Sequence, residues 1–360
     1  MSNPVTENQP PLTRPGLKPI ALSLGVGLVG GLVFWALNVP LAWMLGPMIV
    51  NIAASVRGWP VLIPIEVRTV VLCIVGVFLG GAFTPDLLDR AGAWALSLSL
   101  MFVFVPLITA IAFLYFRFVA RLDAPTAVFS GAPGTLTAMT MVGGESGGDE
   151  RLIALTQGLR VVFVVILMPQ VVTALLASAP HLVTPDPVST GFTWGEAGLL
   201  LVAAATGYLL AWVFKFPAAA MTGAMVATAG LFLSGAVSYH PPEVLQGFAF
   251  WVLGSAIGSR FSTVTAATFF RIARHGVAAT AIVVAVSALF AYGAAKITGA
   301  PYLTALISFT PGGIPEMSLI AIAFGIDPAY VAVHHLTRIA ILILATPVVA
   351  RLLFGRARPA

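Results

Sequence analysis

Long apolar stretches follow one another along the chain, separated by short segments that carry most of the prolines and charges. Because a helix needs about 20 mainly apolar residues to cross a bilayer, each stretch predicts a transmembrane helix. In the first half the stretches are residues 20–37, 40–56, 69–83, 92–118 and 151–173. In the second half they are residues 198–214, 217–238, 244–259, 276–295 and 330–350. The pattern therefore predicts an all-α integral membrane protein with about ten transmembrane helices.

One Pro-Gly segment interrupts each half, at residues 125–144 and 301–325. Gly131 to Met139 reads GAPGTLTAM, and Phe309 to Met317, 178 positions later, reads FTPGGIPEM. At the same spacing lie the pairs Gly76 and Gly254, Gly80 and Gly258, Phe83 and Phe261, Asp149 and Asp327, Arg160 and Arg338, and Pro169 and Pro347; Met44 and Met221 match one residue closer. The glycines, four apart, predict close helix packing. A duplicated apolar chain with breaks at equivalent places is typical of secondary transporters.

The charges favour one of two topologies. Six spans in each half would give parallel repeats, whereas five spans and a re-entrant or broken Pro-Gly segment would give inverted repeats. Lysine and arginine are enriched in cytoplasmic loops. With five spans, all of the 18 lysines and arginines lie on the cytoplasmic side except Arg90 and Lys296, outside, and Arg160 and Arg338, within helices. We therefore expect two inverted repeats in a cytoplasmic membrane, with both termini in the cytoplasm.

This topology divides the chain into five parts. They are a disordered cytoplasmic tail at 1–19, the first repeat at 20–177, an exterior linker at 178–197, the second repeat at 198–351 and a basic cytoplasmic tail at 352–360. The composition, 59% hydrophobic and 9% charged, excludes an ordinary soluble protein. The net charge of +5 comes without a basic helix or an aromatic platform, so we expect no nucleic-acid partner.

The paired Gly-x-Pro-Gly and Thr-Pro-Gly-Gly-x-Pro-Glu-Met segments, each followed by a helix with a mid-span arginine, resemble the bacterial inner-membrane AbrB family, which is known for its internal duplication. The resemblance implies a protein that influences gene expression from the membrane. A second label inherited in that family is ammonia monooxygenase. The first copy departs from the stronger motif, because Thr135, Thr137 and Ala138 stand where the second copy has Gly313, Pro315 and Glu316.

Arg160 and Arg338 lie about nine residues into their helices, close to mid-bilayer. A charge at that depth faces a partner or a water-filled cavity. A guanidinium binds carboxylate or phosphate through two hydrogen bonds, and helix N-termini attract anions. We therefore expect a site for a small polar or anionic metabolite, formed by Pro133, Gly134, Thr135, Thr137, Gln157, Arg160, Pro311, Gly312, Gly313, Pro315 and Arg338. In the alternative interpretation, each arginine caps half-helix carbonyls, or Arg338 pairs with Glu316.

Three titratable residues are confined to the second half, Glu316, His334 and His335, and their first-half equivalents are Ala138, Thr156 and Gln157. A carboxylate or a histidine near neutral pH suits proton coupling. The alternative is that the histidines are satisfied by backbone carbonyls. If protons are coupled, the second half carries them.

The sequence predicts no enzymatic activity, no cofactor and no metal. A monooxygenase needs clustered copper or iron ligands, and adjacent His334 and His335 point about 100° apart on a helix. Histidines 181, 240 and 275 fall in loops or at helix ends. We expect secondary transport of the metabolite, with an indirect effect on gene expression; the alternative is a membrane-bound regulator or sensor that transports nothing. The oligomeric state, a homo-oligomer included, stays open.

Overall fold

The structure is a computed structural model, and it describes residues 16–178, 193–238, 241–262 and 264–355. Most of the predicted N-terminal tail, most of the predicted linker at 178–197 and the end of the C-terminal tail lie outside these residues. Within the described ranges every regular element is a helix. The all-α prediction holds there.

The two halves contain the same order of helices. The first half has α1 (Leu17–Ala36), α2 (Ala42–Val56), α3 (Ile65–Gly81), α4 (Pro85–Leu114) with a π-helical end (Tyr115–Val119), α5 (Ala124–Gly131), α6 (Leu136–Glu145) and α7 (Glu150–Ser178). The second half has α8 (Trp194–Val213), α9 (Ala219–Leu233), α10 (Glu243–Ser259), α11 (Ala266–Thr298), α12 (Tyr302–Phe309), α13 (Ile314–Ala323) and α14 (Pro328–Phe354).

Six of the described helices are long and apolar enough to cross a membrane, which is consistent with a membrane protein. They are Leu17–Ala36, Trp94–Val119, Glu150–Ala177, Trp194–Val213, Ala266–Thr298 and Pro328–Phe354. Helices α2, α3, α9 and α10 are apolar but shorter, at 15 to 17 residues. The total of about ten spans stays a prediction.

Helix α11 begins at Ala266, earlier than the apolar stretch predicted at 276. Arg271, Arg274 and His275 therefore lie in a helix and not in a loop. The hydroxyl of Thr265 accepts a hydrogen bond from the Thr268 amide and caps the helix. Arginine is a good helix former, so the helix extends beyond the segment that hydropathy alone detects.

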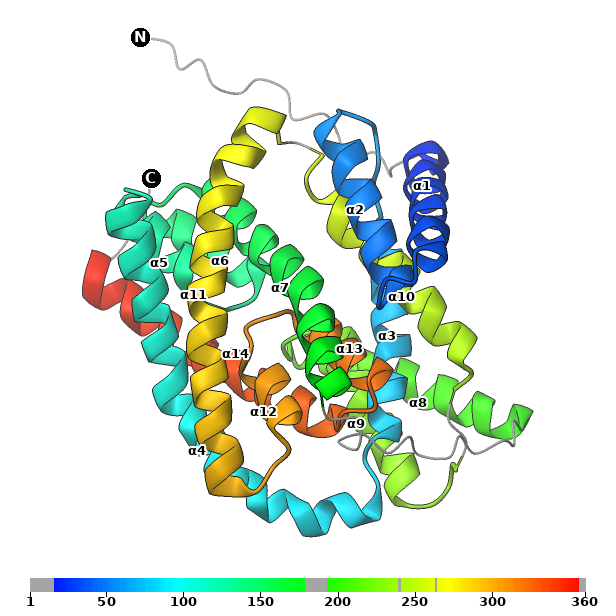
Figure 1. Ribbon diagram of the computed structural model, residues 1–360. Coiled ribbons are helices and arrows are strands. Elements are labelled where there is room, and N and C mark those ends of the chain that lie inside the picture. The colour runs from blue at the N-terminus through cyan, green and yellow to red at the C-terminus, as the bar shows by residue number, and fades with distance from the viewer. Residues whose placement is uncertain (1–15, 179–192, 239–240, 263, 356–360) are drawn as a thin grey trace.

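Two helices are exchanged between the halves. Helix α3 packs mainly against α9, and its equivalent, α10, packs mainly against α2. Glycines permit both contacts, because a Cβ atom at Gly76 would collide with the carbonyl oxygen of Met221, and one at Gly254 with that of Met44. We call α1–α3 and α8–α10 the panel. It occupies the right side of Figure 1.

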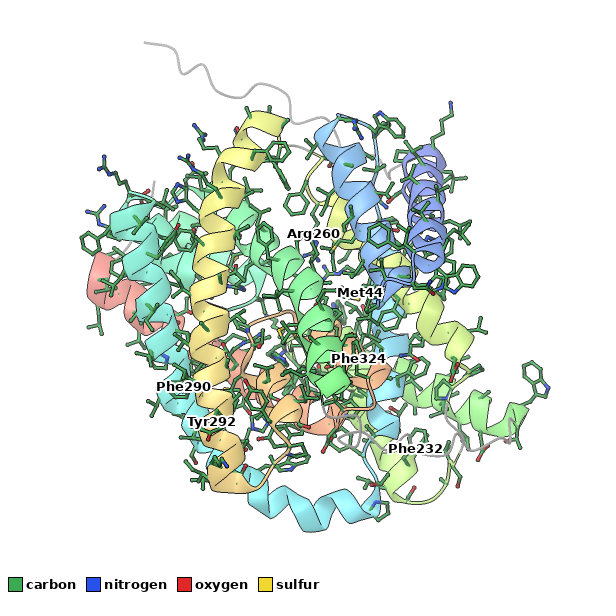
Figure 2. The ribbon with its side chains drawn as sticks, in the orientation of Figure 1. Met44, Phe232, Arg260, Phe290, Tyr292 and Phe324 are labelled. Atoms are coloured by element: carbon green, nitrogen blue, oxygen red, sulfur yellow. The ribbon has the colours of Figure 1, made fainter. Side chains whose placement is uncertain are left out.

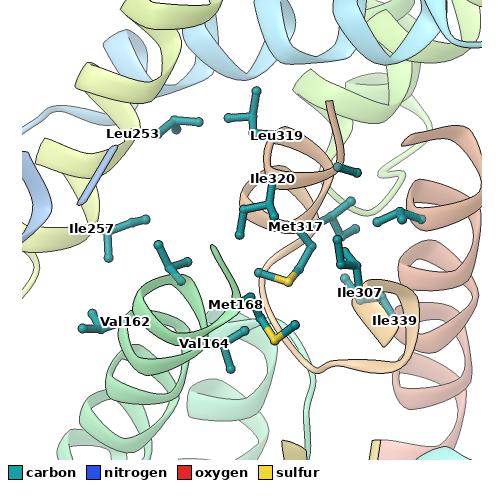
Figure 3. Packing of buried hydrophobic residues seen from close by; sticks show 14 of the residues in the cluster. Val162, Val164, Met168, Leu253, Ile257, Ile307, Met317, Leu319, Ile320 and Ile339 are labelled. Carbon is teal, nitrogen blue, oxygen red and sulfur yellow. The ribbon is translucent and has the colours of Figure 1, made fainter. Parts of the chain in front are cut away.

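The remaining helices, α4–α7 and α11–α14, form a second group that we call the break bundle. In Figure 1, α11 runs from the top of the molecule to the bottom, and its equivalent α4 runs in the opposite direction. Figure 3 shows apolar side chains joining the two groups, with Leu253 and Ile257 of α10 facing Leu319 and Ile320 of α13 and Val162 of α7.

Each Pro-Gly segment forms two short helices separated by a break, at residues 132–135 and 310–313. At 8 and 10 residues, α5 and α6 are roughly 12 and 15 Å long, about half of a hydrocarbon core each. The Thr126 hydroxyl, at the start of α5, accepts a hydrogen bond of 2.8 Å from the Asp149 amide, beyond the end of α6. The first segment therefore returns to the place where it began.

Candidate functional site

A cavity of about 1280 Å³ lies between the panel and the break bundle. The panel contributes residues of α3, Tyr208 of α8, residues 217–220 and the segment that follows α10. The break bundle contributes α7, α14 and both breaks. The cavity is therefore the place where the two duplicated motifs meet.

Most of the predicted binding residues line this cavity. They are Gly134, Thr135, Thr137, Gln157, Arg160, Gly312, Gly313, Pro315 and Arg338. Pro133 and Pro311 instead line a small cavity of about 20 Å³ beside Arg160. Of the residues predicted for proton coupling, Glu316 lines the main cavity and His334 and His335 do not.

The two repeated arginines make equivalent hydrogen bonds. Arg160 donates from Nη1 to the Ala132 carbonyl at 3.2 Å and from Nη2 to the Gly134 carbonyl at 3.4 Å. Arg338 donates from Nη1 to Thr310 at 3.3 Å and from Nη2 to Gly312 at 2.6 Å. Each guanidinium thus caps the carbonyls of its own break while lining the cavity.

The buried Nε atoms of both arginines have no hydrogen-bond partner in the structure. The side chains are 9% and 2% exposed for Arg160 and Arg338, respectively. No ion pair joins Arg338 to Glu316 among the described residues, so that predicted pairing is replaced by the bonds to backbone carbonyls. The arginines keep donors beyond the two that each gives to its break.

Gln157 is a second support of the first break. Its amide nitrogen donates to the carbonyls of Phe129 at 2.7 Å and Ala132 at 2.8 Å. The equivalent residue, His335, is fully buried, and neither of its ring nitrogens has a hydrogen-bond partner in the structure. The two halves therefore use different side chains at the same place.

The N-termini of α6 and α13 open onto the cavity and are capped differently. In the first, the Thr135 hydroxyl accepts a hydrogen bond of 3.4 Å from the Ala138 amide. In the second, Gly313 supplies no side-chain cap, and an oxygen of the Glu316 carboxylate lies where a Cβ atom at residue 313 would be. A negative charge at a helix N-terminus is favourable. The position of the Glu316 carboxylate therefore requires that residue 313 has no Cβ atom.

Positive charge dominates the lining, through Arg68, Arg151, Arg160, Arg260 and Arg338. Among the described residues that line the cavity, Glu316 is the one carboxylate. Arg151 is exposed, Arg68 and Arg260 are partly buried, and the repeated pair is buried. Charge therefore continues from the surface to the breaks, which is an arrangement that draws anions inward.

Arg260 is one of three functional candidates that the sequence analysis missed, together with Arg68 and Arg151, because all three were assigned only to the cytoplasmic side. Arg260 directly follows α10, and Figure 2 labels it in the space between α7 and α2. Burial lowers the pKa of Arg260 to about 10; Arg68 lowers it as well and Glu316 raises it. Arg260 therefore stays charged at neutral pH. The available signal was that Ala82 stands at the equivalent position.

His334 lies away from the cavity in a closed hydrogen-bond network. Its Nδ1 donates to the Tyr330 carbonyl at 2.8 Å, and its Nε2 lies 2.9 Å from the Ser97 hydroxyl. Its ring stacks on that of Tyr330, with centroids 3.9 Å apart. These contacts match the alternative in which the histidine is satisfied within the protein.

Tyr330 belongs to a separate apolar cluster, which we call the packed cluster. It contains Ala82, Phe83, Trp94, Leu98, Ala300, Ala329, Tyr330 and Val333. Five cavity residues have their repeat equivalents in it, at the spacing of 178: Arg151, Leu152, Leu155, Arg260 and Phe261 correspond to Ala329, Tyr330, Val333, Ala82 and Phe83. Equivalent positions thus line a cavity in one place and a filled core in the other.

Potential metal ligands are not clustered. Within the described ranges, no three side chains of His, Cys, Asp or Glu lie close enough to hold a metal ion. His275 lies 3.3 Å from the Tyr115 hydroxyl, and the positions of His181 and His240 are outside those ranges.

Six of the described helices are consistent with a membrane protein, and each half of the chain contains a break and an arginine that binds its carbonyls. The family model described as "Transition state regulatory protein AbrB" matches residues 43–354, and the chain belongs to this AbrB family. It is 27% identical over 338 residues to the "Putative regulator AbrB" of Escherichia coli (strain K12), covering 92% of this chain and 94% of that protein. It is also 26% identical over 358 residues to the "Uncharacterized protein YhjN" of Bacillus subtilis (strain 168), covering 92% of each.

Proposed function

We propose that this protein is a secondary transporter of a small anionic metabolite in the bacterial cytoplasmic membrane. The observation that carries the proposal is the cavity in which Arg160, Arg338 and both breaks meet. Broken helices with a central binding site are the usual construction of such carriers. The cavity lies between two helix groups, which is where one group moving against the other would expose it.

An inverted arrangement of the halves is part of the proposal. The opposite directions of α4 and α11 support it. So does the hydrogen bond between Thr126 and Asp149, because a first Pro-Gly segment that returns to its starting side leaves five spans in the first half. Arg68, Arg151 and Arg260 would then mark the cytoplasmic mouth of the cavity.

Alternating access follows from the inverted arrangement. The cavity would be the cytoplasmic entrance, and the packed cluster would be the closed exterior entrance, since its residues are repeat equivalents of the cavity lining. If the cavity closed and the packed cluster opened, the binding site would become accessible from the exterior side of the membrane instead of the cytoplasmic side.

Glu316 is the proposed proton-coupling residue. It lines the cavity, is 4% exposed, and has only Ala138 as its counterpart in the first half. His334 and His335 are less direct candidates because they lie behind the cavity wall. The proposal includes no enzymatic step and no cofactor.

The second candidate function is a membrane-bound sensor that binds the same anion without moving it. The name of the Escherichia coli relative favours it, because that protein is called a regulator. Under the transporter proposal, any effect on gene expression is indirect and follows from altered metabolite levels.

Reconstitution tests the two candidates. Purified protein in proteoliposomes is supplied with labelled small carboxylates, with and without a pH gradient. Uptake by the parent, and by Arg351→Ala on the exposed last turn of α14, together with no uptake by Arg338→Ala, supports transport. Binding that depends on Arg338 without uptake supports the sensor. No binding and no uptake would overturn both.

A further inference from the structure

We infer that the cavity takes a small molecule with two separated anionic groups, of the dicarboxylate type, and that Arg260 binds the second group. The inference rests on the proposed function, because it assumes that the cavity is an anion site. It adds the charge of the ligand and a specificity-determining residue.

The first reason is the excess of positive charge. Five arginines and one glutamate line the cavity in the described structure. Removing uncompensated charges from bulk water is costly, and a bound counter-charge reduces that cost. A monocarboxylate supplies one negative charge, whereas a dicarboxylate supplies two and leaves less of the excess uncompensated.

The second reason is that the cationic groups come from two walls. Arg160 and Arg338 belong to the break bundle and hold the carbonyls of the two breaks. Arg260 belongs to the panel wall, directly after α10. Apolar side chains such as Leu72, Leu155 and Ile339 line the same cavity. This combination suits two carboxylates joined by a short carbon chain, with one carboxylate toward each wall.

The third reason is an asymmetry between the halves. Arg260 and Glu316 both line the cavity, and their equivalents are Ala82 and Ala138. The second half alone therefore contributes these two residues of opposite charge to the cavity. Glu316 lines the same cavity as Arg260 and attracts it electrostatically, so the second carboxylate of a ligand would bind Arg260 through the same kind of attraction.

The experiment compares ligands that differ in the number and separation of their charges. Binding of propionate, succinate, glutarate and inorganic phosphate to the full chain in detergent is measured by calorimetry and by thermal shift. We expect the parent to bind succinate or glutarate at least roughly tenfold more tightly than propionate. Arg260→Ala should weaken the dicarboxylate by about ten- to a hundredfold and leave propionate unchanged, since one charge-assisted contact is lost.

Two further variants control for folding and for net charge. Arg260→Gln keeps a polar hydrogen-bonding side chain without the charge, and it should lose the same preference if Arg260→Ala proves unstable. Arg57→Ala removes an exposed arginine after α2, outside the cavity, and should retain it.

The outcomes separate the inference from the proposed function. Equal affinity of the parent for propionate and succinate, or an equal loss of both in the Arg260 variants, would overturn the dicarboxylate assignment while keeping an anion site. Tighter binding of phosphate than of either dicarboxylate would contradict the inference that the ligand has two separated anionic groups. If none of the four anions binds, the inference and the proposed function both fail.

Discussion

Part of the cavity lining and part of the packed cluster are built from equivalent positions of the two halves, yet one region is hollow and the other is filled. Arg151 and Arg260 stand in the cavity where Ala329 and Ala82 stand in the cluster. An arginine that lacks a counter-charge resists dry packing, whereas alanine beside Trp94 and Tyr330 favours it. The duplicated fold therefore fixes where the site lies. The side chains at equivalent positions determine which of the two regions is open and which is packed closed.

The largest expected effect distinguishes the two repeated arginines. Arg338→Ala should abolish ligand binding and uptake, and Arg160→Ala should reduce them less. Each also loses two bonds to break carbonyls, of roughly 1.5–3 kcal/mol per charged hydrogen bond. Arg338→Lys should rescue poorly, because an ammonium lacks the planar geometry. Measurements of flux, thermal stability and membrane fractionation test these effects. Full activity of Arg338→Ala would mean that Arg338 only caps the carbonyls of its break.

The next effect concerns Glu316, a carboxylate that the second half has and the first half lacks. Glu316→Gln should keep solute exchange but lose accumulation against a gradient. In the parent, anion affinity should rise as pH falls, because protonation removes a negative charge from the cavity; the variant should lose this dependence. Counterflow and uptake at several pH values test it. An unchanged pH profile, with His334→Gln and His335→Gln also silent, would exclude proton coupling here.

A smaller effect tests the dependence between Gly313 and Glu316. Gly313→Ala places a Cβ atom on the carboxylate at a φ of −73° that alanine adopts without strain, so the Glu316 side chain must shift, at an expected cost of about 0.5–1.5 kcal/mol. Adding Glu316→Ala, which copies Ala138 of the first half, should recover most of that loss. Thermal unfolding of the two single variants and the double variant forms a cycle. Additive effects would mean that the two residues do not interact.

The smallest expected effect comes from cysteine labelling, which tests the accessibility of the cavity and of the packed cluster without altering function. On a Cys73→Ser background, cysteine at Leu152 should react with an impermeant reagent from the cytoplasmic side. Cysteine at the equivalent Ala329, which is fully buried, should stay unreactive until Trp94→Ala loosens the cluster. Cysteines in 260–265 and in the linker at 178–197 should label from opposite sides. Labelling of both from one side would contradict inverted repeats.

The site was more predictable than the packing around it. The spacing of 178 residues identified both breaks and both arginines, because a duplicated motif fixes equivalent positions without any knowledge of contacts. Hydropathy detects apolar helices but not their partners, so the exchange of α3 and α10 was not foreseen, although Gly76 and Gly254 indicated close approach. Arg260 was missed because an arginine after a helix is usually only a topological marker.

The exchange of α3 and α10 also delays one packing contact while this protein is being made. Helix α3 is complete at Gly81, but the surface that Gly76 fits begins at Ala219, on α9. At roughly 5–20 residues per second, the ribosome takes roughly 7 to 30 seconds to reach that point. During that interval the glycine face of α3 lacks its partner. A chain interrupted between the halves therefore leaves the glycine face of α3 without the Met221 carbonyl against which Gly76 packs.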